Sequence, residues 1–156
     1  MSNKLSGQST IKYNITATWR DLNGNIIKVE EKKNLLATIG RAVFAQRLAQ
    51  DNTFTGNIKF GALGSNTTAP AIGDTLLGTE TAGTRKAPTS YSANLNKAYI
   101  TFVYGAAEAV GSHKEFATFI DGSSTINTGI LFSHLAVDWV KTGAQSLTID
   151  CVYTIS

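Results

Sequence analysis

The sequence contains a single cysteine, Cys151, so no intrachain disulfide can form and the fold cannot depend on one. Cys151 lies in an alternating apolar run, which favours a small buried side chain over a nucleophile. No stretch approaches the ~20 consecutive apolar residues of a membrane-spanning helix, and residues 1–10 lack the apolar segment of a secretion signal. We therefore expect a protein that is made in the cytoplasm and does not insert into a membrane.

Charge is also scarce, because Asp, Glu, Lys and Arg make up 16% of the chain against about 25% in ordinary globular proteins. The net charge is +3 and the isoelectric point is about 9.0, but the basic residues are dispersed, as in the pairs Lys32-Lys33 and Arg85-Lys86. A nucleic-acid-binding protein concentrates such residues on one face with aromatic residues among them. We therefore expect no nucleic-acid partner and a neutral, polar surface.

The length of 156 residues fits one domain, which we place at residues 11–156. A domain of this size buries roughly 68–70% of the surface that its unfolded chain exposes, enough for a core without metal or disulfides. Residues 1–10 are too polar to order themselves, and we expect them to form a flexible N-terminal arm.

The first residues of the domain predict a β-hairpin. Residues 11–20 alternate between apolar and polar side chains, the period of a half-buried strand. Asn23-Gly24 suits a type I′ turn, and a return strand over residues 26–33 follows. The segment Asp21 to Asn25 also resembles the start of a calcium loop, but Ile26 stands where such a loop requires glycine.

One helix is predicted, over residues 35–50. Asn34 can cap its first turn, and the apolar residues that follow have helical spacing. This buried stripe consists of Leu36, Ile39, Val43, Phe44 and Leu48. Gly40 weakens the helix by ~1 kcal/mol relative to alanine unless close packing requires it.

The rest of the chain reads as short strands separated by turns. We expect strands at 58–63, 85–91, 97–104, 115–120, 129–137 and 146–155, and a long connection at 64–83. Seven or eight strands at this spacing predict a mostly β fold, an antiparallel, jelly-roll-like β-sandwich with the hairpin and the helix attached.

The residues that could carry catalysis form no recognisable pattern. His113 lies in a turn and is expected to be exposed, while His134 lies in a strand and is expected to be a core or interface histidine. No zinc-ligand spacing, Gly-x-Ser-x-Gly elbow or phosphate loop is present in the sequence. A hydrolase would rest only on scattered carboxylates, namely Asp74, Glu80, Glu108, Glu115, Asp121 and Asp138. We therefore expect no enzymatic activity, no cofactor and no metal site.

Aromatic residues leave a second possibility open. An exposed tryptophan or tyrosine can stack on a sugar ring. Trp19 shares a face with Ile11 and Ile15, so it is expected in the core, whereas the exposure of Trp139 is open. Trp139 is therefore the candidate for ligand stacking; Tyr91, Tyr99 and Tyr104 are equally ambiguous.

The order of several short motifs is more informative. The chain carries Asn34-Leu-Leu before Gly40-Arg41, then Ala62-Leu-Gly followed by Thr67-Thr-Ala-Pro70, then Gly73-Asp-Thr75. Three further features complete the series: Arg85-Lys86, a strand that starts at Glu115, and a final alternating strand over residues 146–155. From residue 34 to the end, this order resembles small structural proteins of tailed bacteriophages, found among tail, fibre and decoration components. Phe60 and Phe119-Ile120 depart from the usual pattern, so loop functions are not transferred.

The resemblance implies a virion component without catalytic residues, assembled as a homotrimer and bound to other virion proteins. A surface of low charge suits repeated contacts between identical subunits. The candidate assembly contacts lie in the arm, in the long loop and in the turn region at 105–114: Leu5, Asn66, Thr67, Thr68, Pro70, Asp74 and His113. The alternative is a carbohydrate- or host-receptor-binding module that uses exposed aromatics.

Overall fold

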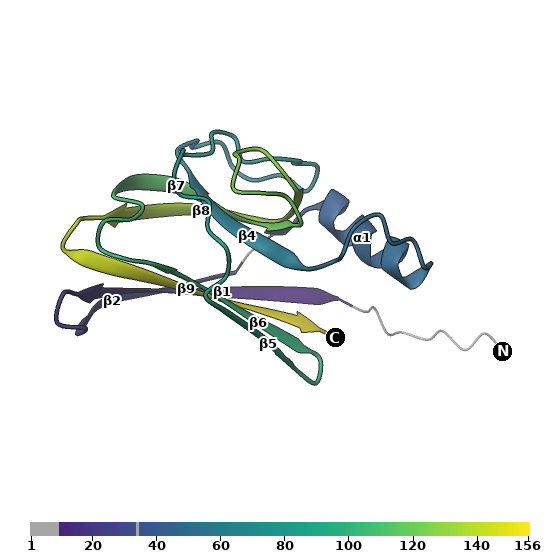
Figure 1. Ribbon diagram of the computed structural model, residues 1–156, viewed down its shortest axis with the longest axis horizontal. Coiled ribbons are helices and arrows are strands. Elements are labelled where there is room, and N and C mark those ends of the chain that lie inside the picture. Colours follow the sequence, from purple (N-terminus) through teal and green to yellow (C-terminus); the bar gives the residue numbers. More distant parts are fainter. Residues whose placement is uncertain (1–9, 34) are drawn as a thin grey trace.

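The computed structural model describes residues 10–33 and 35–156, which form two antiparallel sheets packed face to face (Figure 1). One α-helix, α1 (Thr38–Leu48), lies at one end of the described domain. The predicted β-sandwich with an opening hairpin and a helix near residues 35–50 is therefore confirmed. Residues 1–9 of the expected arm, including Leu5, lie outside the described residues.

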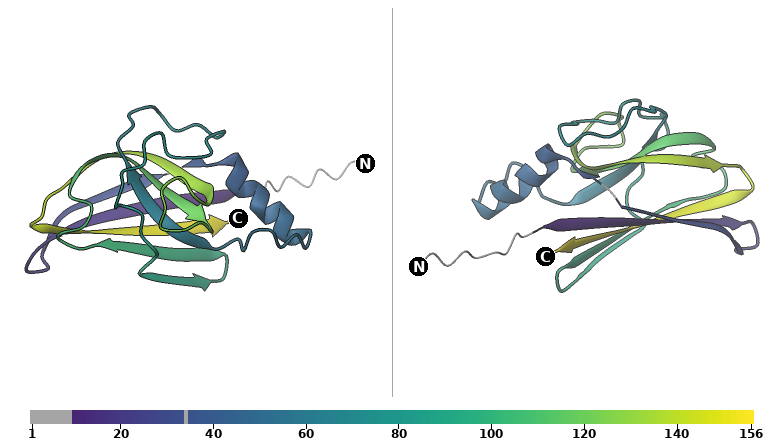
Figure 2. Two further views of the ribbon diagram at one scale, coloured as in Figure 1. Left: turned by 45° about the horizontal axis from the view of Figure 1, so that its top comes forward. Right: turned by 180° about the vertical axis from the view of Figure 1, so that it is seen from behind.

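The larger sheet has five strands and the smaller has four. In spatial order, the larger sheet contains β2 (Ile26–Lys33), β1 (Ile11–Asp21), β9 (Gln145–Ile155), β6 (Lys97–Tyr104) and β5 (Ser90–Asn94). The smaller sheet contains β3 (Leu35–Leu36), β8 (Ile130–Lys141), β7 (Gly111–Ile120) and β4 (Ile58–Gly64). Helix α1, the start of β1 and the end of β9 lie at one end of the sandwich, and the β1–β2 hairpin lies at the other (Figures 1 and 2).

The hairpin between β1 and β2 forms, but not with the predicted type I′ turn. That turn needs a positive φ at both central residues, and Gly24 has a φ of 84° whereas Asn23 is not among the residues with positive φ. The loop instead has three residues, closed by the bond from the Asp21 N–H to the Asn25 carbonyl at 2.9 Å. The Asp21 carboxylate accepts bonds from the N–H groups of Asn23 and Asn25, both at 2.9 Å, and these bonds favour the longer loop.

Helix α1 begins later than predicted. Ala37 occupies the N-cap without a side-chain bond, and Asn34, the predicted cap, lies outside the described residues. Leu35 and Leu36 pair with β8 as a short strand instead, because sheet hydrogen bonds are available to them there. Gly40 is required by packing, since a Cβ at this position would lie 2.7 Å from both the Leu131 carbonyl oxygen and the Phe132 Cα.

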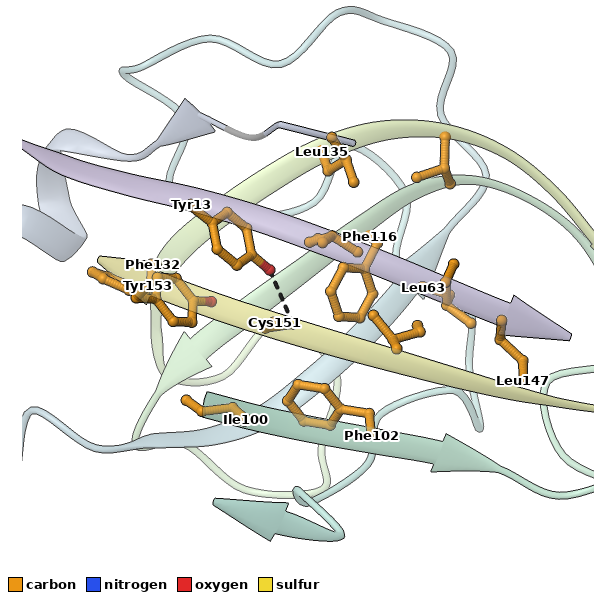
Figure 3. Packing of buried hydrophobic residues seen from close by; sticks show 14 of the residues in the cluster. Tyr13, Leu63, Ile100, Phe102, Phe116, Phe132, Leu135, Leu147, Cys151 and Tyr153 are labelled. Carbon is orange, nitrogen blue, oxygen red and sulfur yellow. Dashed lines mark hydrogen bonds between the residues drawn. The ribbon is translucent and has the colours of Figure 1, made fainter. Parts of the chain in front are cut away.

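The core between the sheets combines aromatic and aliphatic side chains (Figure 3). The rings of Tyr13 and Tyr153 stack with centroids 4.2 Å apart, and the Tyr13 hydroxyl donates to the Cys151 thiol at 3.1 Å. Burial raises the pKa of Cys151 to about 12, so the thiol is a buried apolar group as predicted. Trp19 is also buried in this core, as predicted.

Two strands in the second half of the chain differ from their predicted bounds. Strand β5 begins at Ser90, because Arg85 is drawn into a buried ion pair in the preceding loop. Strand β7 begins at Gly111, because β8 continues to Lys141 and the two strands pair over this extra length, with His113 opposite Trp139. Within the described residues, no helix has the length and apolar character needed to cross a membrane.

Candidate functional site

The long loop between β4 and β5, residues 65–89, is held against the sandwich by one buried carboxylate. Glu115, in β7, is 1% exposed and accepts hydrogen bonds from three backbone N–H groups of the loop. These are the N–H groups of Asn66 at 3.1 Å, Gly78 at 2.8 Å and Thr79 at 3.1 Å. Two distant turns of the loop are thereby fixed to the same side chain.

His134, in β8, extends this clamp to a third point of the loop. Its Nε2 lies 3.0 Å from Glu115 Oε1 and its Nδ1 lies 2.8 Å from Asp74 Oδ2. Ionised carboxylates only accept hydrogen bonds, so both ring nitrogens donate when Asp74 and Glu115 are ionised. Asp74 Oδ2 also accepts the N–H of Ala71 at 2.8 Å, which closes the turn that carries Ile72.

A second clamp joins this loop to the loop at residues 121–129. Arg85 and Glu80 form a bidentate pair, Nε to Oε1 at 2.7 Å and Nη2 to Oε2 at 2.9 Å, with side chains 1% and 0% exposed. Arg85 Nη1 donates to the Thr128 carbonyl at 2.7 Å, and Glu80 accepts the N–H of Asn127 at 3.0 Å. The guanidinium also lies 4.2 Å above the ring of Phe119. A buried ion pair needs such additional partners to offset its desolvation.

In the observed geometry, the side chains of these clusters hold the loop in place. Glu115 and His134 are both buried, and their polar atoms bond to the loop and to each other. Among residues 10–33 and 35–156, no group of three or more His, Cys, Asp or Glu side chains is arranged to hold a metal ion. The clusters fix the backbone of residues 65–80 in one conformation.

The loop residues chosen from the sequence as assembly contacts lie together on this clamped loop. Thr67 and Thr68 are exposed, and Asn66, Pro70 and Asp74 are partly buried. Asn66 Oδ1 accepts the N–H of Thr68 at 2.8 Å, which orders the tip of the loop.

Two of the predicted site residues are corrected by the structure. His113 is 1% exposed instead of lying in an exposed turn, because it is already part of β7, and its Nε2 lies 2.8 Å from the Ala109 carbonyl oxygen. Trp139 is 0% exposed and meets the Trp19 ring edge-on at 5.8 Å, so it has no free face for a sugar. Neither residue belongs to an accessible site.

An apolar groove of about 940 Å³ lies beside the clamped loop, at the end of the domain that carries α1. Three of its aliphatic side chains come from separate segments and are exposed to solvent: Leu48 of α1 by 87%, Ile72 of the loop by 55% and Ile155 of β9 by 50%. Arg41 and Arg47 are the charged residues in its lining. Leu48 was predicted to be buried, and its exposure results from α1 extending past the sheet (Figure 1).

Exposed aromatic side chains lie elsewhere. Among the described residues, Tyr91 is 79% exposed and Tyr99 is 38% exposed, whereas Tyr104 is buried. Tyr91 lines a second groove of about 660 Å³ between β4 and β5, together with Ile58, Phe60 and Pro88.

No protein-family model, curated protein or solved structure matches the chain.

Proposed function

We propose that this protein is a structural component of a tailed-bacteriophage virion, which acts by binding copies of itself and other virion proteins. The order of motifs from residue 34 onwards supports this proposal. The charged residues of those motifs support it as well. Asp74 and Glu115 bond to His134 and to the loop, and Arg85 pairs with Glu80, so that all of them hold the long loop in place. A loop fixed by side chains beneath it presents its backbone as a preformed contact surface, which lowers the entropy lost on binding.

The observation that carries the proposal is the exposed apolar groove next to this fixed loop. Leu48, Ile72 and Ile155 converge on it from three segments, and each exposes half or more of its surface. Exposed apolar side chains that are contiguous, instead of scattered singly, mark an interaction site. Full burial of one such side chain contributes about 1.5–3 kcal/mol, or roughly ten- to hundredfold in an association constant.

The assembly that we propose through this groove is a trimer, the symmetry that the resemblance implies. Charged residues make up only 16% of the chain, which limits the overall repulsion between identical subunits around an axis.

The test is the molar mass of the full chain, measured by light scattering over a range of concentrations. The expected species contains three chains of 16.6 kDa, or a multiple of three. Leu48→Asp should abolish the threefold contact, whereas Leu22→Asp should not. Leu22 is 71% exposed and lies in the hairpin at the opposite end of the domain, so it is a matched control.

A monomer at all concentrations, or equal masses for the Leu48→Asp and wild-type chains, would contradict the proposed assembly. Placement in a virion has its own test, because an antibody against the chain should label tailed particles purified from cells that carry its gene. Unlabelled particles would contradict that part of the proposal.

A carbohydrate-binding role is the second candidate, and the exposure of Tyr91 beside the 660 Å³ groove is the observation that favours it. Its test is a glycan array probed with the wild-type chain and with Tyr91→Ala. Binding by the wild-type chain that the variant loses would support the role, and no binding to any glycan would contradict it.

A further inference from the structure

The edges of the two sheets are protected to different degrees. An exposed edge strand offers unpaired backbone groups to any extended chain, and proteins usually block such edges with inward-pointing charges, short strands or covering loops. In the smaller sheet, β3 has two residues, and β4 is covered by the bridges Gly61 to Lys86 and Gly64 to Glu80. The β4 edge is therefore covered at these two bridges, and the β3 strand offers an incoming chain only two residues, opposite Ser133 and His134 of β8.

Strand β2, one edge of the larger sheet, is blocked by charge. Lys28, Glu30 and Lys32 lie opposite the buried residues Trp19, Ala17 and Ile15 of β1, so they occupy the inner face of the sheet. They form ion pairs with one another, Lys28 to Glu30 at 3.4 Å and Lys32 to Glu30 at 3.1 Å. A strand added to this edge would have to meet these charges on its inner side.

Strand β5, the other edge, has none of these protections. Its five residues, Ser90 to Asn94, carry no charge and are all exposed. Tyr91 lies opposite Ile100 of β6, and therefore on the inner face, yet it is 79% exposed because β4 does not cover it. An edge that is uncharged, exposed and beside an apolar groove is built to accept a strand.

The turn that follows β5 provides an independent observation. Leu95 has a φ of +52° and is 98% exposed. A positive φ is unfavourable for leucine and readily adopted by glycine or asparagine, so the fold of a single chain gives no reason for leucine at this position. Strain of this kind points to a functional role for the side chain.

We propose that β5 pairs antiparallel with β5 of a second copy of this chain, around a two-fold axis at Ser92. In this register Tyr91 lies opposite Ala93 of the second copy and Ser90 lies opposite Asn94, so that large meets small and polar meets polar. Leu95 then lies beside Thr89 of the second copy, next to the Ala87 and Pro88 that line the 660 Å³ groove. Each copy inserts its Leu95 into the groove of the other, and the two larger sheets become continuous.

This contact is two-fold and uses a different surface from the groove at α1. If the protein also forms the trimer proposed above, a closed assembly that uses both contacts contains a multiple of six chains, the smallest being a pair of trimers. The β5 contact does not depend on the virion role, and it requires an even number of chains in the assembly.

Leu95→Asn tests the insertion of Leu95 into the groove of the second copy. It should not harm the fold, because asparagine tolerates the positive φ. We expect the mass of the assembly in light scattering to fall by half, while the Tm at a concentration where both chains are dissociated stays equal or rises. Leu22→Asn, a substitution in the β1–β2 hairpin loop at a residue 71% exposed, should leave the mass unchanged. An unchanged mass for Leu95→Asn would overturn the proposal.

Ser92→Cys tests the register. Two copies of this residue meet at the two-fold axis, so mild oxidation should link the chains into disulfide-bonded pairs on a non-reducing gel. Glu31→Cys, at an exposed position of the β2 edge, should give far fewer pairs. The native Cys151 is buried and does not compete.

The two proposals fail in distinguishable ways. Equal masses for Leu48→Asp and wild type speak against the trimer contact alone, whereas an uncross-linked Ser92→Cys chain speaks against the β5 contact alone. Glycan binding that Tyr91→Ala abolishes, together with no cross-link at residue 92, would assign the second groove to a sugar and refute the pairing of β5.

Discussion

Replacing Glu115 by glutamine should destabilise the protein far more than the same replacement at an exposed glutamate. The Glu115 carboxylate accepts four hydrogen bonds, two at each oxygen, from three loop N–H groups and from His134. In glutamine an NH₂ group replaces one of the oxygens. If the NH₂ group replaces Oε1, the N–H of Gly78 and the Nε2 of His134 face a donor. If it replaces Oε2, the N–H groups of Asn66 and Thr79 do.

The size of the effect follows from these contacts. A hydrogen bond to a charged group contributes about 1.5–3 kcal/mol, and a buried donor left without an acceptor costs about 1–3 kcal/mol. Loss of the two bonds at one oxygen, with some relaxation of the loop, should therefore lower the free energy of unfolding by about 3 kcal/mol. A domain of this kind has about 5–15 kcal/mol in total.

Urea unfolding followed by the fluorescence of the buried Trp19 and Trp139 measures this loss. Glu108→Gln is the matched control, since Glu108 also accepts a backbone N–H, that of Gly105 at 2.7 Å, but its side chain is 48% exposed. We expect the control to lose less than about 1 kcal/mol. Amide exchange at Gly78 and Thr79 should also accelerate in Glu115→Gln. Equal losses in the two variants would refute the clamp.

Three further predictions concern packing, thiol chemistry and pH. Gly40→Ala should destabilise by about 2 kcal/mol despite its higher helix propensity, because the new Cβ meets Leu131 and Phe132; thermal melts measure this, and a rise in Tm would contradict it. Cys151 should not react with a thiol reagent until urea unfolds the chain, because burial raises its pKa to about 12; rapid labelling of the native protein would contradict this. Hydrogen bonds lower the pKa of Asp21, that from the Asn25 side chain most and those from the backbone N–H groups of the turn less. Ionised Asp21 therefore stabilises the fold above its ordinary pKa of 3.8, and this stabilisation is lost as the pH falls through the lowered pKa. The difference in urea midpoint between wild type and Asp21→Asn should therefore shrink in acid, and a constant difference would exclude this role.

Strands β1, β6 and β9 of the larger sheet could be read from the sequence because their burial alternates. In β1, Tyr13, Ile15 and Trp19 are buried and Lys12 and Asn14 are exposed, as a period of two requires. The final strand follows the same rule. Such strands face the core on one side only, so the alternation of apolar and polar side chains is enough to predict the strand and its buried face.

The clamp could not be predicted because its members are far apart in the chain. The sequence shows Asp74, Glu115 and His134 as separate candidates, because the order and register of the strands that bring them together are properties of the whole sheet. Periodicity also failed at Leu48, because helical spacing indicates which face of a helix is apolar and not how far the sheet beneath it extends. Leu95 carried no signal, since its positive φ is visible only in the structure.

The order of the strands also has a consequence for how the protein is made. Strand β9 is the middle strand of the larger sheet, with β1 on one side and β6 on the other, yet it is the last strand of the domain to leave the ribosome. Ile11 pairs with Ile155, so the larger sheet cannot close until residues 145–155 have been synthesised. Contacts so distant in sequence form slowly, and until they form the inner edges of β1 and β6 are open to other nascent chains. A chain interrupted before Gln145 should therefore accumulate as aggregate, whereas one that loses residues from α1 would still have every strand of its larger sheet.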